Sequence, residues 1–174
     1  MLSKKLGKNT YTASAGRIST DSYGVTIKKL ALAGKEKGSF AQLVPHRLVA
    51  GPNHLFAALE QAMDAIEKGS EFTKSPELEF IVRLVAEKQL DKALKAAEFG
   101  KEELVLVVLG GKKELEQIAR EISFEIKEGE LRGDPKQIAK HFQISEKELA
   151  ALADLPNALE ELAIERTAFV SLAR

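Results

Sequence analysis

Apolar residues recur at helical spacing in two segments near the middle of the chain. After Gly51-Pro52, large apolar side chains repeat every three or four positions as far as Gly69, and this spacing predicts an amphipathic helix. Proline suits a first helical turn and glycine commonly follows a last one, so these residues mark the two ends. A second helix is predicted to begin at Ser75-Pro76, apolar around most of its circumference, with Glu79 and Arg83 on its one polar strip. Such a helix must be covered on more than one side.

Other segments carry the patterns of strands. Residues 104–109 form a nearly continuous apolar run with three valines, which predicts a central strand buried on both faces. Alternating apolar and polar positions predict strands at residues 9–18 and 122–126, the second with one face in water. Residues 40–44 predict a fourth strand, which ends at Pro45 because proline has no backbone N–H to donate.

The remaining periodic segments are predicted to be helices. Ser145 and Glu148 form a capping box, with Ile144 and Leu149 at the spacing of a hydrophobic staple. Further helices are predicted at residues 23–33, 89–99 and 112–120, after Asp134-Pro135 and after Pro156. Because helices and strands interleave, we expect an α+β (mixed α/β) fold, with one small sheet packed with several helices and a helical C-terminal third. Residues 1–174 are expected to form a single domain, with about residues 1–8 as a flexible end.

Composition narrows the class of protein. Hydrophobic residues make up 44% of the 174 residues and charged residues 30%, as in a soluble globular protein. The chain has no cysteine, which excludes disulfides, cysteine-based zinc sites, iron–sulfur ligation and thiol nucleophiles. No apolar run approaches 18 residues and the N-terminus is polar, so we expect neither a membrane span nor a signal peptide, and a cytoplasmic location.

The formal net charge is zero, but the charge is unevenly spread. Residues 1–50 carry nine basic and two acidic side chains, whereas the rest of the chain is net acidic. The basic third either meets a polyanion or forms a solvated edge without a partner. With eight Phe, two Tyr and no Trp, a broad base-stacking platform is not expected.

Candidate chemistry is sparse. The three histidines form no paired zinc motif, and the sequence has no G-x-S-x-G elbow or other catalytic arrangement, so neither a metal, a cofactor nor an enzyme is expected. Gly110-Gly111, followed by Lys112 and Lys113, leads from a buried strand into a helix N-terminus that could hold an anion, or it is only a tight turn with exposed lysines. His54, in a first helical turn, could donate to a phosphate or ribose, or hydrogen-bond the loop before it.

The order of several segments resembles one known family. These segments are residues 49–55, residues 58–62, Ser75 with Glu79, residues 88–93 and residues 164–168. Together they resemble the small KEOPS-complex subunit family, which includes the PRPK-binding protein of animals and its archaeal and fungal relatives. The resemblance covers the chain from about Phe40 to its end. It implies a non-catalytic subunit that binds the N-terminal lobe of the KEOPS kinase/ATPase.

The resemblance also implies a role with RNA. The kinase joins the threonylcarbamoyl transferase, which modifies the adenosine next to the anticodon, and the small subunit helps to recruit tRNA through its 3′ CCA end. The alternative is a structural adaptor that only braces the kinase and does not touch RNA. The departures from the family pattern, such as Pro52-Asn53 in place of a more charged pair, affect the tRNA contacts rather than the fold.

Site residues follow from the resemblance and from charge. By resemblance, the expected contacts with the tRNA end are Gly51, His54, Ser75, Lys88 and Gln89. Charge alone adds Arg47, Lys74 and Lys92, which form a positive rim if they gather in space. For the kinase interface we expect apolar side chains near the C-terminus that cannot all face one core: Leu162, Ile164, Phe169 and Leu172. For each of these four, packing in the core is the alternative.

Overall fold

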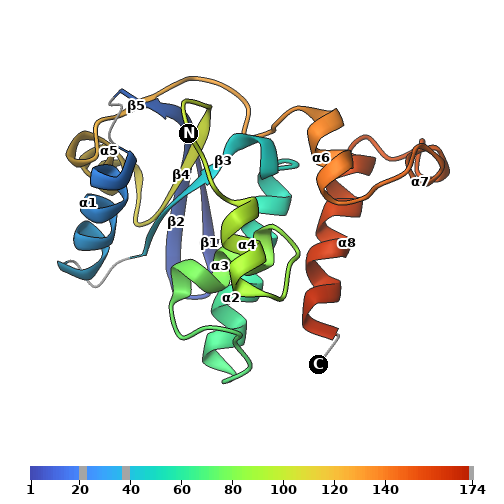
Figure 1. Cartoon of the computed structure of the whole chain (residues 1–174), viewed down its shortest axis with the longest axis horizontal. Coiled ribbons are helices and arrows are strands. Elements are labelled where there is room, and N and C mark those ends of the chain that lie inside the picture. Colours follow the sequence, from blue (N-terminus) through green and yellow to red (C-terminus); the bar gives the residue numbers. More distant parts are fainter. Residues whose placement is uncertain (20–22, 37–39, 173–174) are drawn as a thin grey trace. The chain divides into compact units, whose positions relative to one another are not determined.

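The computed structural model describes residues 1–19, 23–36 and 40–172. These residues form a five-stranded sheet and eight α-helices, which confirms the predicted α+β class (Figure 1). The strands are β1 (Leu2–Leu6), β2 (Asn9–Ile18), β3 (Ala41–Pro45), β4 (Leu104–Leu109) and β5 (Phe124–Ile126). The helices are α1 (Tyr23–Glu36), α2 (Pro52–Glu67), α3 (Pro76–Leu84), α4 (Leu90–Ala96), α5 (Lys112–Glu121), α6 (Pro135–His141), α7 (Glu146–Ala151) and α8 (Ala158–Leu172). The chain divides into two compact units, one of residues 1–46 and 99–131 and the other of residues 47–98 and 132–174.

The first unit is built on the sheet. Its strands run in the order β1-β2-β4-β3, all antiparallel, and β5 also pairs with β2. The central strand β4 is fully buried from Leu104 to Val108, as the continuous apolar run predicted. The helices α1 and α5 contribute Leu30, Leu115 and Ile118 to the core beside this sheet. The strand β1 was not predicted, because its residues are largely polar and its side chains are exposed except at Leu6.

The predicted strand at residues 122–126 is shorter in the structure. The Ile122 N–H donates to the Ile118 carbonyl, so Ile122 completes α5 instead of starting a strand. Ser123 has a φ of 57°, which turns the chain before β5 begins at Phe124. The alternation of Ile122, Phe124 and Ile126 is therefore shared between a helix end and a strand.

The second unit is helical. The helix α3 contacts α2, α4 and α8, and Phe80, Val82 and Leu84 are fully buried, so it is covered on several sides as predicted. Its polar strip is not solvated, however, because Glu79 is fully buried and Arg83 is 2% exposed. The predicted start of α7 is confirmed: Ser145 Oγ accepts a hydrogen bond from the Glu148 N–H at 3.2 Å, and the Glu148 carboxylate accepts from the Ser145 N–H at 2.8 Å.

A helix that crosses a membrane needs about 20 mostly apolar residues. Within the residues that the structure describes, no helix is long and apolar enough to cross a bilayer.

Candidate functional site

The N-terminus of α2 is capped by a residue far away in the sequence. The N-cap Gly51 has no side chain to accept a hydrogen bond, and Glu160 of α8 takes that role. The Glu160 carboxylate accepts from the Asn53 N–H at 2.6 Å and the His54 N–H at 3.1 Å. A Cβ atom on Gly51 would collide with this carboxylate, so a residue without a side chain is needed there. The anion-binding end of α2 is thus filled by the chain's own carboxylate.

His54 lies in the interior and both ring nitrogens have partners. Its Nδ1 accepts from the Ala50 N–H at 3.2 Å. The Thr167 hydroxyl donates to the Ala163 carbonyl, so it accepts from His54 Nε2–H at 3.2 Å. Burial, and secondarily the charge on His141, lowers the pKa of His54 to about 3, so the ring is neutral.

These contacts answer the question that the sequence left open for His54. The ring is fully buried and fixes the loop before α2, so in this structure His54 hydrogen-bonds the loop, and its contact with tRNA stays a prediction. Gly51 is buried as well, and its place is set by the approach of Glu160. Both residues position the start of α2 rather than present a surface.

Ser75 and Lys74 lie in the loop that leads into α3. Ser75 caps this helix, because its Oγ accepts from the Leu78 N–H at 3.4 Å. Lys74 is exposed and pairs with Glu71. The buried Glu79 carboxylate holds the same loop by accepting from the Phe72 N–H at 2.8 Å and the Thr73 N–H at 3.1 Å.

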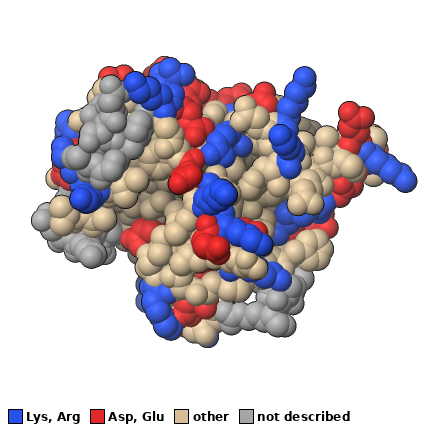
Figure 2. Space-filling view, in the orientation of Figure 1, with Lys and Arg blue, Asp and Glu red and all other residues tan. Residues whose placement is uncertain are grey.

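The predicted cationic residues do not all share one place. Arg47 donates to the Ala96 carbonyl at 3.2 Å and to the Glu98 carbonyl at 2.6 Å, so it secures the end of α4. Lys88, Gln89 and Lys92 are exposed together at the turn from α3 into α4. Lys74 precedes α3 whereas Lys88 follows it, and nine helical residues span roughly 13 Å. Basic and acidic side chains are intermingled over the face that Figure 2 shows.

An open cleft of about 570 Å³ lies beside this turn, between α3, α6 and α8. Lys88 is one of its lining residues. The others are Val85, Ala86, His141, Phe142, Gln143, Arg166, Phe169 and Val170. His141 Nε2 lies 3.0 Å from the Val85 carbonyl and donates to it, and burial lowers the pKa of this imidazole. His141, Gln143 and Arg166 were not predicted as site residues. The one signal for them in the sequence is that Arg166 falls within residues 164–168, which carry part of the family resemblance.

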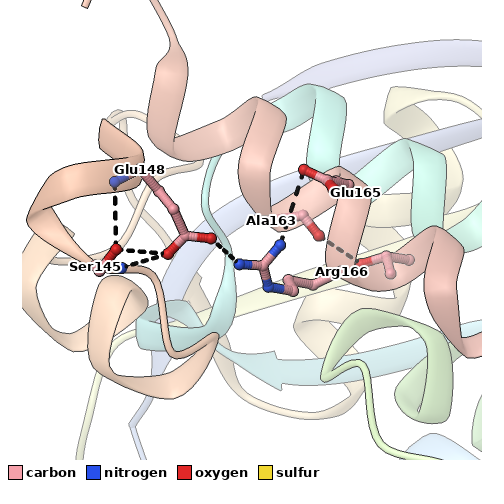
Figure 3. Close-up of polar contacts among 6 residues, drawn as sticks. Ser145, Glu148, Ala163, Glu165 and Arg166 are labelled. Carbon is pink, nitrogen blue, oxygen red and sulfur yellow. Dashed lines mark hydrogen bonds and ion pairs between the residues drawn. The ribbon is translucent and has the colours of Figure 1, made fainter. Parts of the chain in front are cut away.

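Arg166 reaches the cleft while bound to two carboxylates (Figure 3). It forms an ion pair with Glu148 of α7, and its Nη1 lies 3.8 Å from a carboxylate oxygen of Glu165. Hydrogen bonds from the Ser145 backbone and side chain, and then the Arg166 contact, lower the pKa of Glu148 to about 2. Glu148 is therefore an anion throughout the neutral range.

The four apolar residues expected at a kinase interface separate in the structure. Leu162 is 5% exposed and packs in a cluster with Ala50, Ile138 and Phe142, which favours the core alternative, and its role at a kinase interface stays a prediction. Ile164 is half-buried, whereas Phe169 is 51% exposed at the cleft. Leu172 ends α8, and its side chain lies outside the described residues.

The turn at Gly110-Gly111 is also capped by a carboxylate of the same chain. The Glu114 side chain accepts from the Gly111 N–H at 2.7 Å, and Lys112 pairs with Glu116 at 3.6 Å. The N-terminus of α5 is thus capped from within, which favours the tight-turn interpretation over an anion site.

These features describe a small α+β protein whose helical unit carries a cleft of mixed apolar and cationic character. Residues 22–171 match the family model described as kinase binding protein CGI-121, so the chain belongs to this family. The match confirms the resemblance to the small KEOPS subunit family. A comparison with curated proteins found no match.

Proposed function

We propose that this protein is a non-catalytic adaptor that binds the N-terminal lobe of the KEOPS kinase/ATPase and recruits tRNA through its 3′ CCA end. The tRNA would then reach the threonylcarbamoyl transferase, which acts next to the anticodon, in the cytoplasm. The family match carries the kinase-binding half of the proposal. The turn at Lys88, Gln89 and Lys92 supports the RNA half, because two lysines and an amide stand exposed beside a cleft with an accessible aromatic ring.

One observation favours the alternative, an adaptor that braces the kinase without touching RNA. Glu87 and Asp91 lie in the same turn as Lys88 and Lys92, so the segment from 87 to 92 has no net charge. A segment without net charge attracts phosphates only where its lysines lie closer to them than its carboxylates do. The two proposals therefore differ in one measurable property, the affinity of the isolated chain for tRNA.

The test compares intact tRNA with tRNA lacking its three terminal nucleotides, in gel-shift titrations at rising salt. The proposal expects binding to the intact tRNA that weakens as salt rises and drops sharply after trimming. The double variant Lys88→Glu/Lys92→Glu should lose at least tenfold in affinity while still forming a complex with the kinase. Lys112→Glu/Lys113→Glu, which makes the same charge change at exposed positions of the sheet unit, is the matched control. Equal binding of trimmed and intact tRNA would remove the recruiting role and leave the bracing adaptor.

A further inference from the structure

The helix α1 of the sheet unit turns large apolar side chains toward solvent. Three large apolar side chains among the described residues are more than half exposed, and two of them, Ile27 at 51% and Leu32 at 57%, belong to α1. The helix is nevertheless anchored, because Leu30 lies in the core of the sheet unit and Thr26 is 1% exposed. One side of α1 therefore packs in the core, and another side leaves apolar surface in water.

Apolar and cationic side chains alternate on this exposed side. Residues four apart are neighbours on a helix surface, so Lys28 lies beside Leu32, and Ile27 lies beside Ala31. Lys29 is exposed next to them. We call these five exposed side chains the α1 face. It has two short rows of the kind that a second helix can pack against.

The lysines of the α1 face have no acidic neighbour along the helix. The positions three and four residues away from Lys28 and Lys29 hold glycine, valine, threonine, alanine and leucine. On α2, by contrast, Lys68 pairs with Asp64 at 2.9 Å across four positions. With three lysines and one glutamate, α1 has a formal net charge of +2. The α1 face is thus cationic as well as apolar, and it attracts a partner of negative charge.

Three kinds of partner fit this face poorly. A second copy of the chain, docked through its own α1, would bring two helices of the same charge together. The phosphates of RNA would pair with Lys28 and Lys29 but would leave Ile27 and Leu32 in water. A helix that lies on a membrane inserts a continuous apolar face, whereas Leu30 of α1 is committed to the core. A protein surface that combines carboxylates with apolar side chains complements both properties.

We propose that the α1 face docks an acidic amphipathic helix of a partner protein. The apolar stripe of that helix would cover Ile27 and Leu32, and carboxylates beside the stripe would pair with Lys28 and Lys29. The apolar contact supplies affinity, and the charges set orientation and the rate of encounter. The surface belongs to the sheet unit, whereas the turn at Lys88 belongs to the helical unit, so the inference does not depend on the proposed function.

Fluorescence anisotropy with a labelled synthetic helical peptide and the full chain tests the proposal. The peptide consists of leucine, alanine and glutamate in an order that places the leucines in one stripe flanked by carboxylates. A control peptide has the same composition in an order that forms no stripe. The wild-type chain should bind the striped peptide and not the control, and binding should weaken as salt rises because exposed charges are screened.

Variants of the chain separate the apolar contribution from the charged one. Leu32→Ala should weaken peptide binding about tenfold, because it removes apolar surface that the peptide buries. Its matched control is Leu155→Ala, which truncates a leucine that is 47% exposed in the helical unit. Lys28→Glu/Lys29→Glu should weaken binding by about tenfold or more, since two attractions become repulsions.

Lys112→Glu/Lys113→Glu is the matched control for the charge change, at exposed positions of α5. Both controls should stay within about twofold of the wild-type affinity for the peptide. Thermal unfolding of every variant shows that the fold is kept, and gel-shift titration with tRNA shows that the proposed RNA contact is unchanged.

Four results would overturn the proposal. The wild-type chain does not bind the striped peptide, or it binds both peptides equally. Leu32→Ala leaves peptide binding unchanged, in which case charge alone attracts the peptide. Duplex RNA or vesicles containing phosphatidylserine bind more tightly than the peptide and lose binding in Lys28→Glu/Lys29→Glu, so the face serves a nucleic acid or a lipid. The same variant fails to form the complex with the kinase, so the α1 face is part of the kinase interface.

Discussion

At the scale of single residues, the neutral ring of His54 links two segments of the helical unit. The Ala50 N–H donates to its Nδ1, and its Nε2–H donates to Thr167. Protonation of Nδ1 would remove the acceptor that Ala50 uses, and it would place a charge in the interior. The fold therefore contains a histidine that must stay neutral.

This requirement predicts a loss of stability in mild acid. The pKa of His54 is about 3 in the folded protein and near its usual 6.5 when unfolded, so the unfolded chain binds the proton first as pH falls. Below about pH 6.5 and down to about pH 3, the free energy of unfolding should fall by up to about 1.4 kcal/mol per pH unit from this group. Urea unfolding at pH 7, 6 and 5 measures the loss, and His54→Gln should show a smaller one. A His54 ring whose nitrogen resonances titrate near pH 6.5 in the folded protein would contradict the prediction.

At the scale of elements, α3 is held by a buried ion pair within the helix. The Glu79 carboxylate accepts from Arg83 Nε at 2.9 Å and from its Nη2 at 2.7 Å, and the guanidinium lies 5.0 Å from the centre of the Phe72 ring. The other carboxylate oxygen holds the loop before the helix. Glu79 therefore ties the helix to the loop that contains Lys74 and Ser75.

Breaking this pair should be costly because it leaves a buried charge without its partner. Arg83→Met is expected to lower the free energy of unfolding by about 3–5 kcal/mol, the usual effect of removing one member of a buried pair. The pair of Lys68 and Asp64 has the same four-residue spacing but is exposed, so Lys68→Met is the matched control and should change stability little. Urea unfolding curves of the two variants give the comparison. A similar small effect for both would show that burial adds nothing to the Glu79–Arg83 pair.

The elements also show what a sequence can predict. Three predictions that depend on residues close together in the sequence are confirmed. They are the start of α2 at Pro52, the buried strand β4 and the capping box of α7. The burial of Glu79 and Arg83 depends on which helices cover α3, and the sequence pattern showed only a polar strip. The strand β1 was missed because its pairing with β2, not its composition, makes it a strand.

The candidate site was less predictable than the fold for the same reason. Glu160 caps α2 from more than 100 positions away, which no local motif could indicate. The cleft joins residues from α3, α6 and α8 that are distant in sequence. Lys88 was predicted from the family resemblance and Phe169 from its apolar character, for different partners, and only the structure places both on one cleft.

At the scale of the whole molecule, zero net charge and a strand at the edge of the sheet both favour association between copies of the chain. A protein without net charge has little electrostatic protection against association. The strand β1 lies at one end of the sheet order, where an unpaired edge can add a strand from a second copy. Lys4 and Lys5 are exposed on this strand, and lysines on an edge oppose such pairing. The basic charge of β1 thus fits a solvated edge, one of the two interpretations that the sequence left open for the first 50 residues.

Removing the two lysines should therefore affect association rather than RNA binding. Lys4→Thr/Lys5→Thr gives β1 two residues that favour strands and no charge, so light scattering at rising protein concentration should show association that the wild-type chain lacks. Lys112→Thr/Lys113→Thr removes the same charge from the start of α5 and separates the effect of the edge from that of net charge. Binding of intact tRNA should stay within twofold for the β1 variant, because Lys88, Gln89 and Lys92 of the proposed RNA contact belong to the helical unit. If the β1 variant stays monomeric and loses RNA affinity instead, the basic N-terminal third serves a polyanion after all.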